Sequence, residues 1–234
     1  MRHRIYVDAL APTVIVEGDE FHHSIRVVRV RPGEEVELFD RAGNAAKGRV
    51  ESIDRDRAVI VTGTVLPSRE SPLALHLAMA VIQLEKFELV LQKATELGVR
   101  SIIPLVTERV ELRRERYAGK QERWEKIIFE AVKQSGRTAV PRLEPPAEFA
   151  DVIARPGDKI LFDADADLLP PTANRQPPTD LTIFIGPEGG WSDDELRMAR
   201  EQECFFQRLG PRRLRAETAA IAALAVVASR FGDL

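Results

Sequence analysis

The sequence contains little cysteine and no long apolar run, and both absences exclude whole classes of protein. Cys204 is the single cysteine in 234 residues, so an internal disulfide is excluded and a reducing compartment is expected. No apolar stretch approaches the ~20 residues that span a bilayer. The opening segment Met1–Asp8 also lacks the apolar centre of a signal peptide. We therefore expect a cytoplasmic protein that makes no contact with a membrane.

Strong charge of one sign is absent as well. The formal net charge is only -3, so any nucleic-acid site must be a local basic patch. The four histidines have no spacing that forms a metal site with carboxylates or with Cys204, and no metal is expected. Neither Gly-x-Gly-x-x-Gly nor Gly-x-x-x-x-Gly-Lys-Ser/Thr occurs, which excludes the dinucleotide fingerprint and the P-loop.

Short alternating runs dominate the first 70 residues and predict a small β-barrel or sandwich. The expected strands are Thr13–Val16, Glu35–Phe39, Ala46–Ile53 and Ala58–Leu66, with one helix at His22–Val30. The segment Pro67–Pro72 has two prolines and no apolar residue, which is typical of a linker. We therefore predict one domain over residues 1–70 and a second over residues 73–234.

From Leu73 onward the pattern changes to alternating strands and helices. The expected strands are Leu75–Val81, Ser101–Val106, Lys159–Phe162, Leu181–Ile185 and Cys204–Arg208. Helical spacing of apolar residues covers 84–97 and 121–134, and a capping box at Ser192–Glu195 begins another helix. This order predicts an α/β fold with a mostly parallel sheet and helices on both faces. Asp165–Asp180, rich in Pro and Asp, is expected to be a surface loop.

The last helical segment, Thr218–Ala228, is apolar almost all round. Such a helix must be buried on most sides. Either it lies at the centre of its own domain, or a partner chain covers one of its faces.

Two loops in the last quarter of the chain follow predicted strands and precede predicted helices. One is Gly186–Gly190, after Leu181–Ile185, and the other is Leu209–Thr218, after Phe205–Arg208. The carboxyl ends of parallel strands are where ligands bind in open α/β sheets. Glycine would let the backbone approach such a ligand closely. A tight strand-to-helix turn is the alternative reading of the first loop.

The residues within these loops indicate what kind of ligand they would hold. Glu188 would repel a phosphate, so the first loop suits a ligand with a cationic or hydroxyl-rich part. Arginine side chains in the second loop suit phosphate and carbonyl groups, although surface arginines are also commonly just solvated. They are Arg208, Arg212, Arg213 and Arg215.

Together the two loops resemble the signature of the SPOUT methyltransferases and, more narrowly, of the bacterial 16S ribosomal RNA (uracil-N3)-methyltransferase family. The resemblance extends over nearly the whole chain. The matching runs are His23–Arg29, Glu85–Glu88, Gln92–Val99, Thr107–Arg109, Trp124 and Gln134–Arg137. It implies a C-terminal α/β domain with a deep trefoil knot, preceded by a PUA-like RNA-binding barrel, and a homodimer as the active unit.

The resemblance also implies S-adenosylmethionine as the cofactor, bound in the loops of the knot. Transferred to this sequence, the cofactor-binding residues lie in three segments. They are Leu161, Phe162, Gly186, Pro187, Glu188, Gly189, Gly190, Leu209, Gly210, Leu214, Arg215 and Thr218. The implied substrate is 16S ribosomal RNA in the small ribosomal subunit, and the candidate RNA-binding residues are His23, Arg26, Arg29 and Arg109. The first three of these fall at helical spacing on one face.

The implied reaction is methylation of N3 of a uridine. Removal of the N3 proton spreads negative charge onto O2 and O4, so a base and a cationic donor are the expected aids. Arg215 is the candidate cation and Glu217 the candidate base, although Glu217 could equally cap the last helix or orient Arg215. The target base must be unpaired or flipped out. Another SPOUT RNA methyltransferase, acting on a ribose 2′-oxygen or a tRNA base, and a non-enzymatic RNA-binding assembly factor remain as alternatives.

Overall fold

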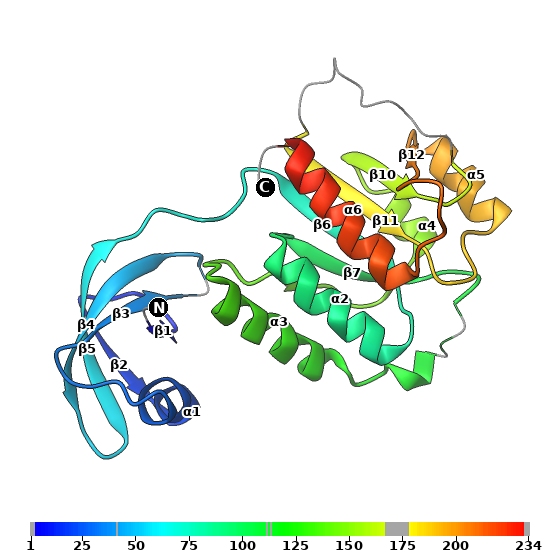
Figure 1. Cartoon of the computed structure of the whole chain (residues 1–234). Coiled ribbons are helices and arrows are strands. Elements are labelled where there is room, and N and C mark those ends of the chain that lie inside the picture. The colour runs from blue at the N-terminus through cyan, green and yellow to red at the C-terminus, as the bar shows by residue number, and fades with distance from the viewer. Residues whose placement is uncertain (1–2, 41, 111, 113, 167–177, 232–234) are drawn as a thin grey trace. The chain divides into compact units, whose positions relative to one another are not determined.

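The computed structural model of the chain describes residues 3–40, 42–110, 112, 114–166 and 178–231 (Figure 1). The chain divides into two compact units, Met1–Glu70 with Val132–Val140, and Ser71–Ala131 with Pro141–Leu234. Each unit has a β-sheet of its own. Within the described ranges, no helix is both long and apolar enough to cross a membrane.

The first unit is built on a curled five-stranded sheet of order β1-β3-β4-β5-β2. Its strands are β1 His3–Tyr6, β2 Thr13–Glu17, β3 Glu35–Phe39, β4 Ala45–Ile53 and β5 Arg57–Val65. Only the β1–β3 pair is parallel among these neighbours. Two register shifts interrupt the β4–β5 pairing, and such bulges bend a sheet. The four predicted strands are confirmed, whereas β1 was not predicted.

The helical segment of this unit differs from the expected single helix at His22–Val30. It begins earlier, as α1 Gly18–Phe21, and continues as the π-helical turn η1 His22–Val27. Arg29 lies beyond its end with a φ of 63°, in the left-handed region, and cannot continue a right-handed helix. The alternating apolar side chains of the strands meet Phe21 and Ile25 of this segment in one core.

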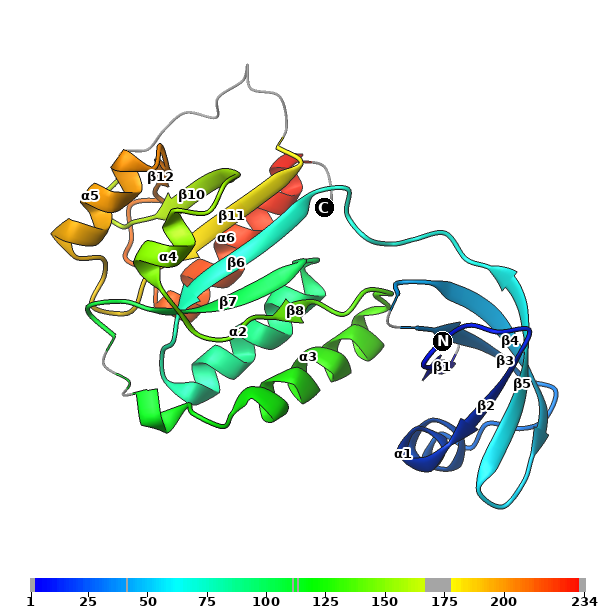
Figure 2. The same ribbon diagram turned by 180° about the vertical axis from the view of Figure 1, so that it is seen from behind.

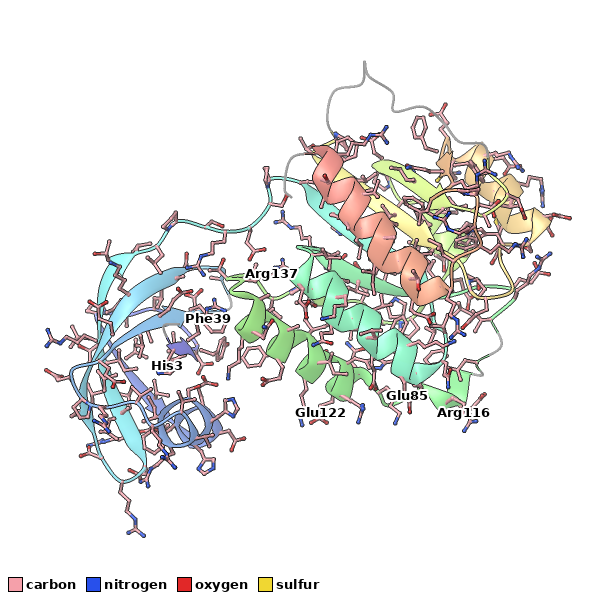
Figure 3. The ribbon with its side chains drawn as sticks, viewed as in Figure 1. His3, Phe39, Glu85, Arg116, Glu122 and Arg137 are labelled. Carbon is pink, nitrogen blue, oxygen red and sulfur yellow. The ribbon has the colours of Figure 1, made fainter. Side chains whose placement is uncertain are left out.

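The end of the long helix α3, Gln121–Ser135, also belongs to the first unit, and Arg4 of β1 holds it there. The guanidinium of Arg4 donates to the carbonyl oxygens of Val132 at 2.9 Å and Lys133 at 3.0 Å. These carbonyls belong to the last turn of α3, where a cation is favourable because the carboxyl end of a helix carries a partial negative charge. Glu37 accepts from Arg4 Nε at 2.9 Å, and the guanidinium carbon lies 4.4 Å from the centre of the Phe39 ring. Phe39 and Arg137 are labelled in Figure 3.

A second ion pair fixes the turn that follows α3. The Arg137 guanidinium, almost fully buried, donates to Glu70 at 2.6 Å, and the backbone N–H groups of Thr138 and Ala139 donate to the other carboxylate oxygen. Burial alone would raise the pKa of the Glu70 carboxyl, but these hydrogen bonds outweigh burial and hold the pKa below its ordinary value. Residues 132–140 are therefore bound to the first unit by buried polar contacts at both ends.

The second unit contains a seven-stranded sheet with the order β12-β10-β11-β6-β7-β8, and β9 also pairs with β7. Among the described residues, every strand pairing in this sheet is parallel. Its strands are β6 Ala74–Ala80, β7 Ser101–Val106, β8 Arg142–Leu143, β9 Ala147–Glu148, β10 Asp158–Phe162, β11 Asp180–Ile185 and β12 Phe205–Gln207. The predicted parallel sheet is confirmed, and the short strands β8 and β9 were not predicted.

Helices cover both faces of this sheet, as the two opposite views show (Figures 1 and 2). They are α2 Leu84–Glu96, α3, α4 Phe149–Ile153, α5 Asp193–Glu201 and α6 Ala216–Phe231, with a 3-10 turn η2 at Arg114–Arg116. α2 packs against α6 on one face, and α4 packs against α5 on the other. The capping box predicted at Ser192 is confirmed, because Ser192 Oγ accepts from the Glu195 N–H and Glu195 accepts from the Ser192 N–H. The helix α4 was not predicted.

The apolar helix α6 is buried on only part of its circumference. Ala220, Ala223 and Leu224 are fully buried, in the region where α6 packs against α2 and β11. On its other side Val226 is 43% exposed, and Leu89 of α2 is 41% exposed. Within one chain α6 is thus a core helix with an uncovered apolar side. The surface loop expected over Asp165–Asp180 falls mostly on residues 167–177, which lie outside the described ranges, and Asp180 itself begins β11.

Candidate functional site

A cavity of about 640 Å³ lies at the carboxyl ends of three neighbouring strands, β10, β11 and β12. The segments that follow these strands supply most of its lining. They are residues 162–165, 185–191, 208–210 and 212–216, joined by Arg109, Asp193, Leu196 and Ala219. The sequence places both predicted loops here because parallel strands end at the same edge of the sheet.

The glycine loop after β11 is fixed by Trp191. A Cβ added to Gly186 would lie 3.0 Å from the Trp191 ring, so this glycine is required by the packing of the indole. The indole N–H donates to the Phe162 carbonyl oxygen at 3.0 Å, which ties the glycine loop to the end of β10. Trp191 is nearly fully buried and packs on Phe149 of α4.

The other two glycines of this loop are needed for different structural reasons. A Cβ at Gly189 would lie 3.2 Å from Cβ of Arg109, whose guanidinium donates to the Gly189 carbonyl oxygen at 3.2 Å. Gly190 has a φ of +70°, and its N–H closes a turn onto the Pro187 carbonyl at 2.9 Å. At Gly186 and Gly189 the close approach is therefore made by protein side chains.

The arginine loop after β12 presents one buried donor and several exposed cations to the cavity. Arg208 Nε is buried and has no hydrogen-bond partner in the described part of the chain. Arg212, Arg213 and Arg215 are exposed, and Arg213 pairs with Asp165 at 3.2 Å, from the segment after β10. The pair joins two of the three segments that line the cavity, although an exposed pair of this kind contributes only about 0–1 kcal/mol.

Acidic side chains line the cavity alongside the arginines. Asp163, Asp165, Glu188 and Asp193 all belong to the lining. Glu188 pairs with Lys86 of α2 at 3.3 Å, and both side chains are partly exposed. A ligand that carries both a positive and a negative group could find complementary partners here.

Most residues predicted to bind a cofactor line the cavity, and two do not. Those in the lining are Phe162, Gly186, Pro187, Glu188, Gly189, Gly190, Leu209, Gly210, Leu214 and Arg215. Leu161 is fully buried in the core beneath α4 and α5, and Thr218 is exposed on α6, both outside the lining. Pattern reasoning did not select Trp191 or Asp163, although each directly follows a segment that it did select. It singled out Arg208 as a loop arginine but did not assign it to the cofactor.

The two candidate catalytic residues are placed differently. Arg215 immediately precedes α6, lines the cavity and is exposed. Glu217 lies in the first turn of α6, outside the lining, and its Oε2 is buried with no hydrogen-bond partner among the described residues. A carboxylate in the first turn of a helix stabilises the helix N-terminus. The role of Glu217 as a base stays a prediction.

The RNA-binding candidates lie in both units. In the first unit His23, Arg26 and Arg29 are all exposed, and the left-handed backbone of Arg29 costs of the order of 1 kcal/mol. The Arg26 guanidinium donates to the Arg55 carbonyl oxygen and lies over the Phe21 ring. In the second unit Arg109 is exposed and lines the cavity.

Cys204 does not offer a reactive thiol in this fold, where its side chain is buried. Burial raises the pKa of the Cys204 thiol to about 12, so the thiol is protonated near neutral pH and a poor nucleophile. In the described part of the chain, no group of three or more His, Cys, Asp or Glu side chains could hold a metal ion.

Comparison with known proteins defines the class. The family model described as RNA methyltransferase domain matches residues 69–228, and the model described as RNA methyltransferase PUA domain matches residues 16–62. With the parallel sheet and the curled N-terminal sheet, these matches confirm the predicted SPOUT-type α/β fold preceded by a PUA-like domain. The protein is thus an RNA methyltransferase by class.

Similarity to individual proteins identifies the family within this class. The chain is 32% identical to ribosomal RNA small subunit methyltransferase E of Bacillus subtilis, over 93% of this chain and 90% of that protein. A protein of the same name from Buchnera aphidicola is 29% identical over 98% of this chain and 94% of that protein. A crystal structure of ribosomal RNA small subunit methyltransferase E from Neisseria gonorrhoeae, bound to S-adenosyl methionine, superposes with a TM-score of 0.89 at 31% identity over 100% of both chains. The chain belongs to the ribosomal RNA small subunit methyltransferase E family.

Proposed function

We propose that this protein transfers a methyl group from S-adenosylmethionine to N3 of a specific uridine in 16S ribosomal RNA. One observation carries the proposal: the segments after β10, β11 and β12 together line one cavity, in a chain that belongs to this family. The N3 position and the trefoil knot are expectations from the family resemblance, and the cytoplasmic location is an expectation from the composition of the sequence.

The residues of the cavity fit S-adenosylmethionine. Its volume of about 640 Å³ lies within the range of roughly 300–1,000 Å³ that is usual for small-molecule sites. The buried Arg208 Nε is a donor without a partner in the described residues, and it suits the carboxylate of the methionine part. Asp163, Glu188 and Asp193 suit its ammonium and sulfonium groups. When bound, the cofactor supplies a methyl group that is already electrophilic.

The residues of the chain then bind the cofactor and orient it toward the target base. The backbone of the glycine loop and of Leu209 and Gly210 forms the walls against which the cofactor would rest. Trp191 holds the first wall to the end of β10 through its indole N–H. Holding donor and acceptor in line makes a large contribution to such a transfer.

Arg215 is the residue that we assign to charge stabilisation. When N3 of uridine loses its proton, negative charge spreads onto O2 and O4, and a fixed guanidinium beside them lowers the barrier. Arg215 is exposed at the edge of the cavity, where an incoming base can reach it. Glu217 lies two residues further, and we propose it as the proton acceptor or as the group that stabilises the start of α6.

The first unit is proposed to dock the RNA. His23, Arg26 and Arg29 lie on an exposed segment, and a basic segment of this kind binds phosphates without reading sequence. The strained backbone at Arg29 supports a functional reason for that side chain, because glycine would occupy the position without strain.

We also propose that the active unit is a homodimer. The uncovered apolar side of α6, with Val226, and the neighbouring Leu89 of α2 would be buried by a second copy. Small alanines along α6 permit close helix packing. Sedimentation velocity would show twice the 26.2 kDa chain mass for a dimer and the single mass otherwise.

The glycine loop provides a prediction about cofactor affinity. Gly186→Ala places a methyl group against the Trp191 ring and should lower the affinity for S-adenosylmethionine by tenfold or more, measured by titration calorimetry. Gly119→Ala is the control: Gly119 has a φ of +77° outside the cavity lining and its added methyl meets no atom within 4 Å, so it should cost only the ~1–2 kcal/mol of left-handed strain in stability. Equal affinity in Gly186→Ala and wild type would show that the Trp191 contact does not shape the site.

One experiment tests the proposed function itself. Purified protein is incubated with small ribosomal subunits that lack the modification and with isotopically labelled S-adenosylmethionine, and the label is then located by mass spectrometry of the RNA. We expect one labelled uridine, with the methyl group on N3. Label on a ribose 2′-oxygen or on another base would assign a different RNA methyltransferase activity. Absence of label, together with tight RNA binding, would indicate an assembly factor.

A further inference from the structure

Glu195 is a buried carboxylate that makes one contact more than its own helix requires. It lies in the first turn of α5 and is 3% exposed. Its Oε2 accepts from the Ser192 N–H at 2.8 Å, which completes the capping box. Its Oε1 accepts from the N–H of Glu108 at 2.9 Å, in the segment after β7. The second contact joins α5 to a loop 87 residues away in the sequence.

The loop that Glu195 holds is a turn with Arg109 at its tip. The turn closes through the hydrogen bond from the Val110 N–H to the Thr107 carbonyl oxygen at 3.2 Å. β6 separates β7 from β11 in the sheet, yet Arg109 reaches the glycine loop after β11. There its guanidinium donates to the Gly189 carbonyl oxygen, and its Cβ fills the space that a side chain at Gly189 would need.

We propose that Glu195 is a positioning residue that holds Arg109 against the glycine loop, so that binding of the cofactor and binding of RNA are coupled. The inference rests on the proposed function, in which residues 186–190 contact S-adenosylmethionine and Arg109 contacts RNA. A cofactor that orders the glycine loop also orders Gly189 and hence Arg109. RNA then binds more tightly to the cofactor-loaded protein, and by linkage the cofactor binds more tightly to the RNA-bound protein.

The chemistry of the two acceptor oxygens makes the inference testable. A glutamine at position 195 has one acceptor oxygen, and its amide group would face a backbone N–H donor. Glutamine still serves as the third residue of a capping box, so Glu195→Gln should keep the Ser192 contact and lose the Glu108 contact. Ser192→Ala is the matched control, because it removes the Ser192 Oγ acceptor from the cap and leaves the Glu195–Glu108 contact in place.

A second variant breaks the same contact from the other side. Glu108 occupies the second position of the Thr107–Val110 turn, where proline is favoured. Glu108→Pro removes the N–H that donates to Glu195 and leaves the carboxylate and the α5 cap unchanged. If Glu195→Gln does not fold, Glu108→Pro carries the test alone.

The experiment measures the RNA KM, kcat, and the affinity for a short uridine-containing RNA with and without S-adenosylhomocysteine. In Glu195→Gln and Glu108→Pro we expect the RNA KM to rise about tenfold with kcat changed less than threefold, and the effect of the cofactor product on RNA affinity to disappear. Ser192→Ala should lower the melting temperature and leave the RNA KM unchanged. Added to Arg109→Gln, Glu195→Gln should cause no further loss, because both act through one contact.

Two results would overturn the inference. One is an equal rise of the RNA KM in Ser192→Ala and Glu195→Gln, which would mean that general loosening of α5 explains both. The other is additive loss in the double variant with Arg109→Gln. Failure of the proposed function is a separate outcome, because wild-type protein would then transfer no methyl group to small subunits.

Discussion

Replacement of Arg215 by glutamine lowers kcat by roughly 10²–10³-fold, as expected when one donor to a developing oxyanion is removed. The side chain is exposed and lines the cavity, so its loss leaves no buried charge and the fold intact. Glutamine keeps hydrogen-bonding capacity but lacks the charge that would stabilise O2 and O4 of a deprotonated uracil. The measurement is single-turnover methyl transfer at saturating RNA and cofactor, which separates chemistry from binding.

Arg212→Gln is the control for Arg215→Gln. Arg212 belongs to the same loop, is exposed and lines the same cavity, so it removes the same charge from the same surface. We expect its effect to appear in RNA affinity and salt dependence, with the single-turnover rate within threefold of wild type. Equal rate losses in both variants would show that the loop contributes only general positive charge, and Arg215 would lose its assigned role.

Replacement of Arg4 by methionine is expected to lower the free energy of unfolding by about 3–5 kcal/mol. The Arg4 side chain is 12% exposed and the Glu37 side chain is 8% exposed. Methionine fills similar space but leaves Glu37 without one of its two arginine partners and exposes the last carbonyls of α3 to an apolar neighbour. The loss should appear as a lower urea midpoint, with the first unit melting earlier than the second.

The exposed Arg57–Asp54 pair, in the same unit, provides the control for the buried Arg4 guanidinium. Both side chains are more than half exposed, and removal of such a pair changes stability by less than about 1 kcal/mol. Arg57→Met should therefore leave the urea midpoint nearly unchanged. A small effect of Arg4→Met, similar to that of Arg57→Met, would show that the α3 end does not depend on the buried guanidinium.

Much of the architecture could be predicted from local patterns. The strands Ser101–Val106 and Glu35–Phe39 were predicted to the residue, because alternation and continuous apolar runs record which strand faces are buried. The capping box at Ser192 was predictable because its two hydrogen bonds lie within four residues. Both loops at the cavity followed from the rule that parallel strands end at one edge.

The features that the patterns did not reveal depend on contacts between distant segments. β1 is four residues long and is defined by its pairing with β3, about thirty positions later. The sequence between Val132 and Val140 continues a regular helix and its turn, and contacts with distant residues such as Arg4, Glu20 and Glu70 assign it to the first unit. No local pattern indicates that Gly186 accommodates Trp191 or that Gly189 accommodates Arg109.

The candidate site was predicted in outline and differs in detail. Glycines in a loop after a strand indicate close approach, but the sequence does not show whether a ligand or a side chain approaches. Glu195 looked like a capping residue alone, and its contact with the Glu108 N–H requires the folded sheet. The family resemblance also assigned Leu161 and Thr218 to the cofactor site, and both residues lie outside the lining of the cavity.

A crystal structure of the protein grown with saturating S-adenosylmethionine tests the central claim most directly. The account predicts ligand density in the cavity at the ends of β10, β11 and β12, in contact with the glycine loop and with Leu209–Gly210, and with a hydrogen bond to the Arg208 guanidinium. Density at any other place on the chain, or a cavity that stays closed by its own side chains at saturation, would contradict it.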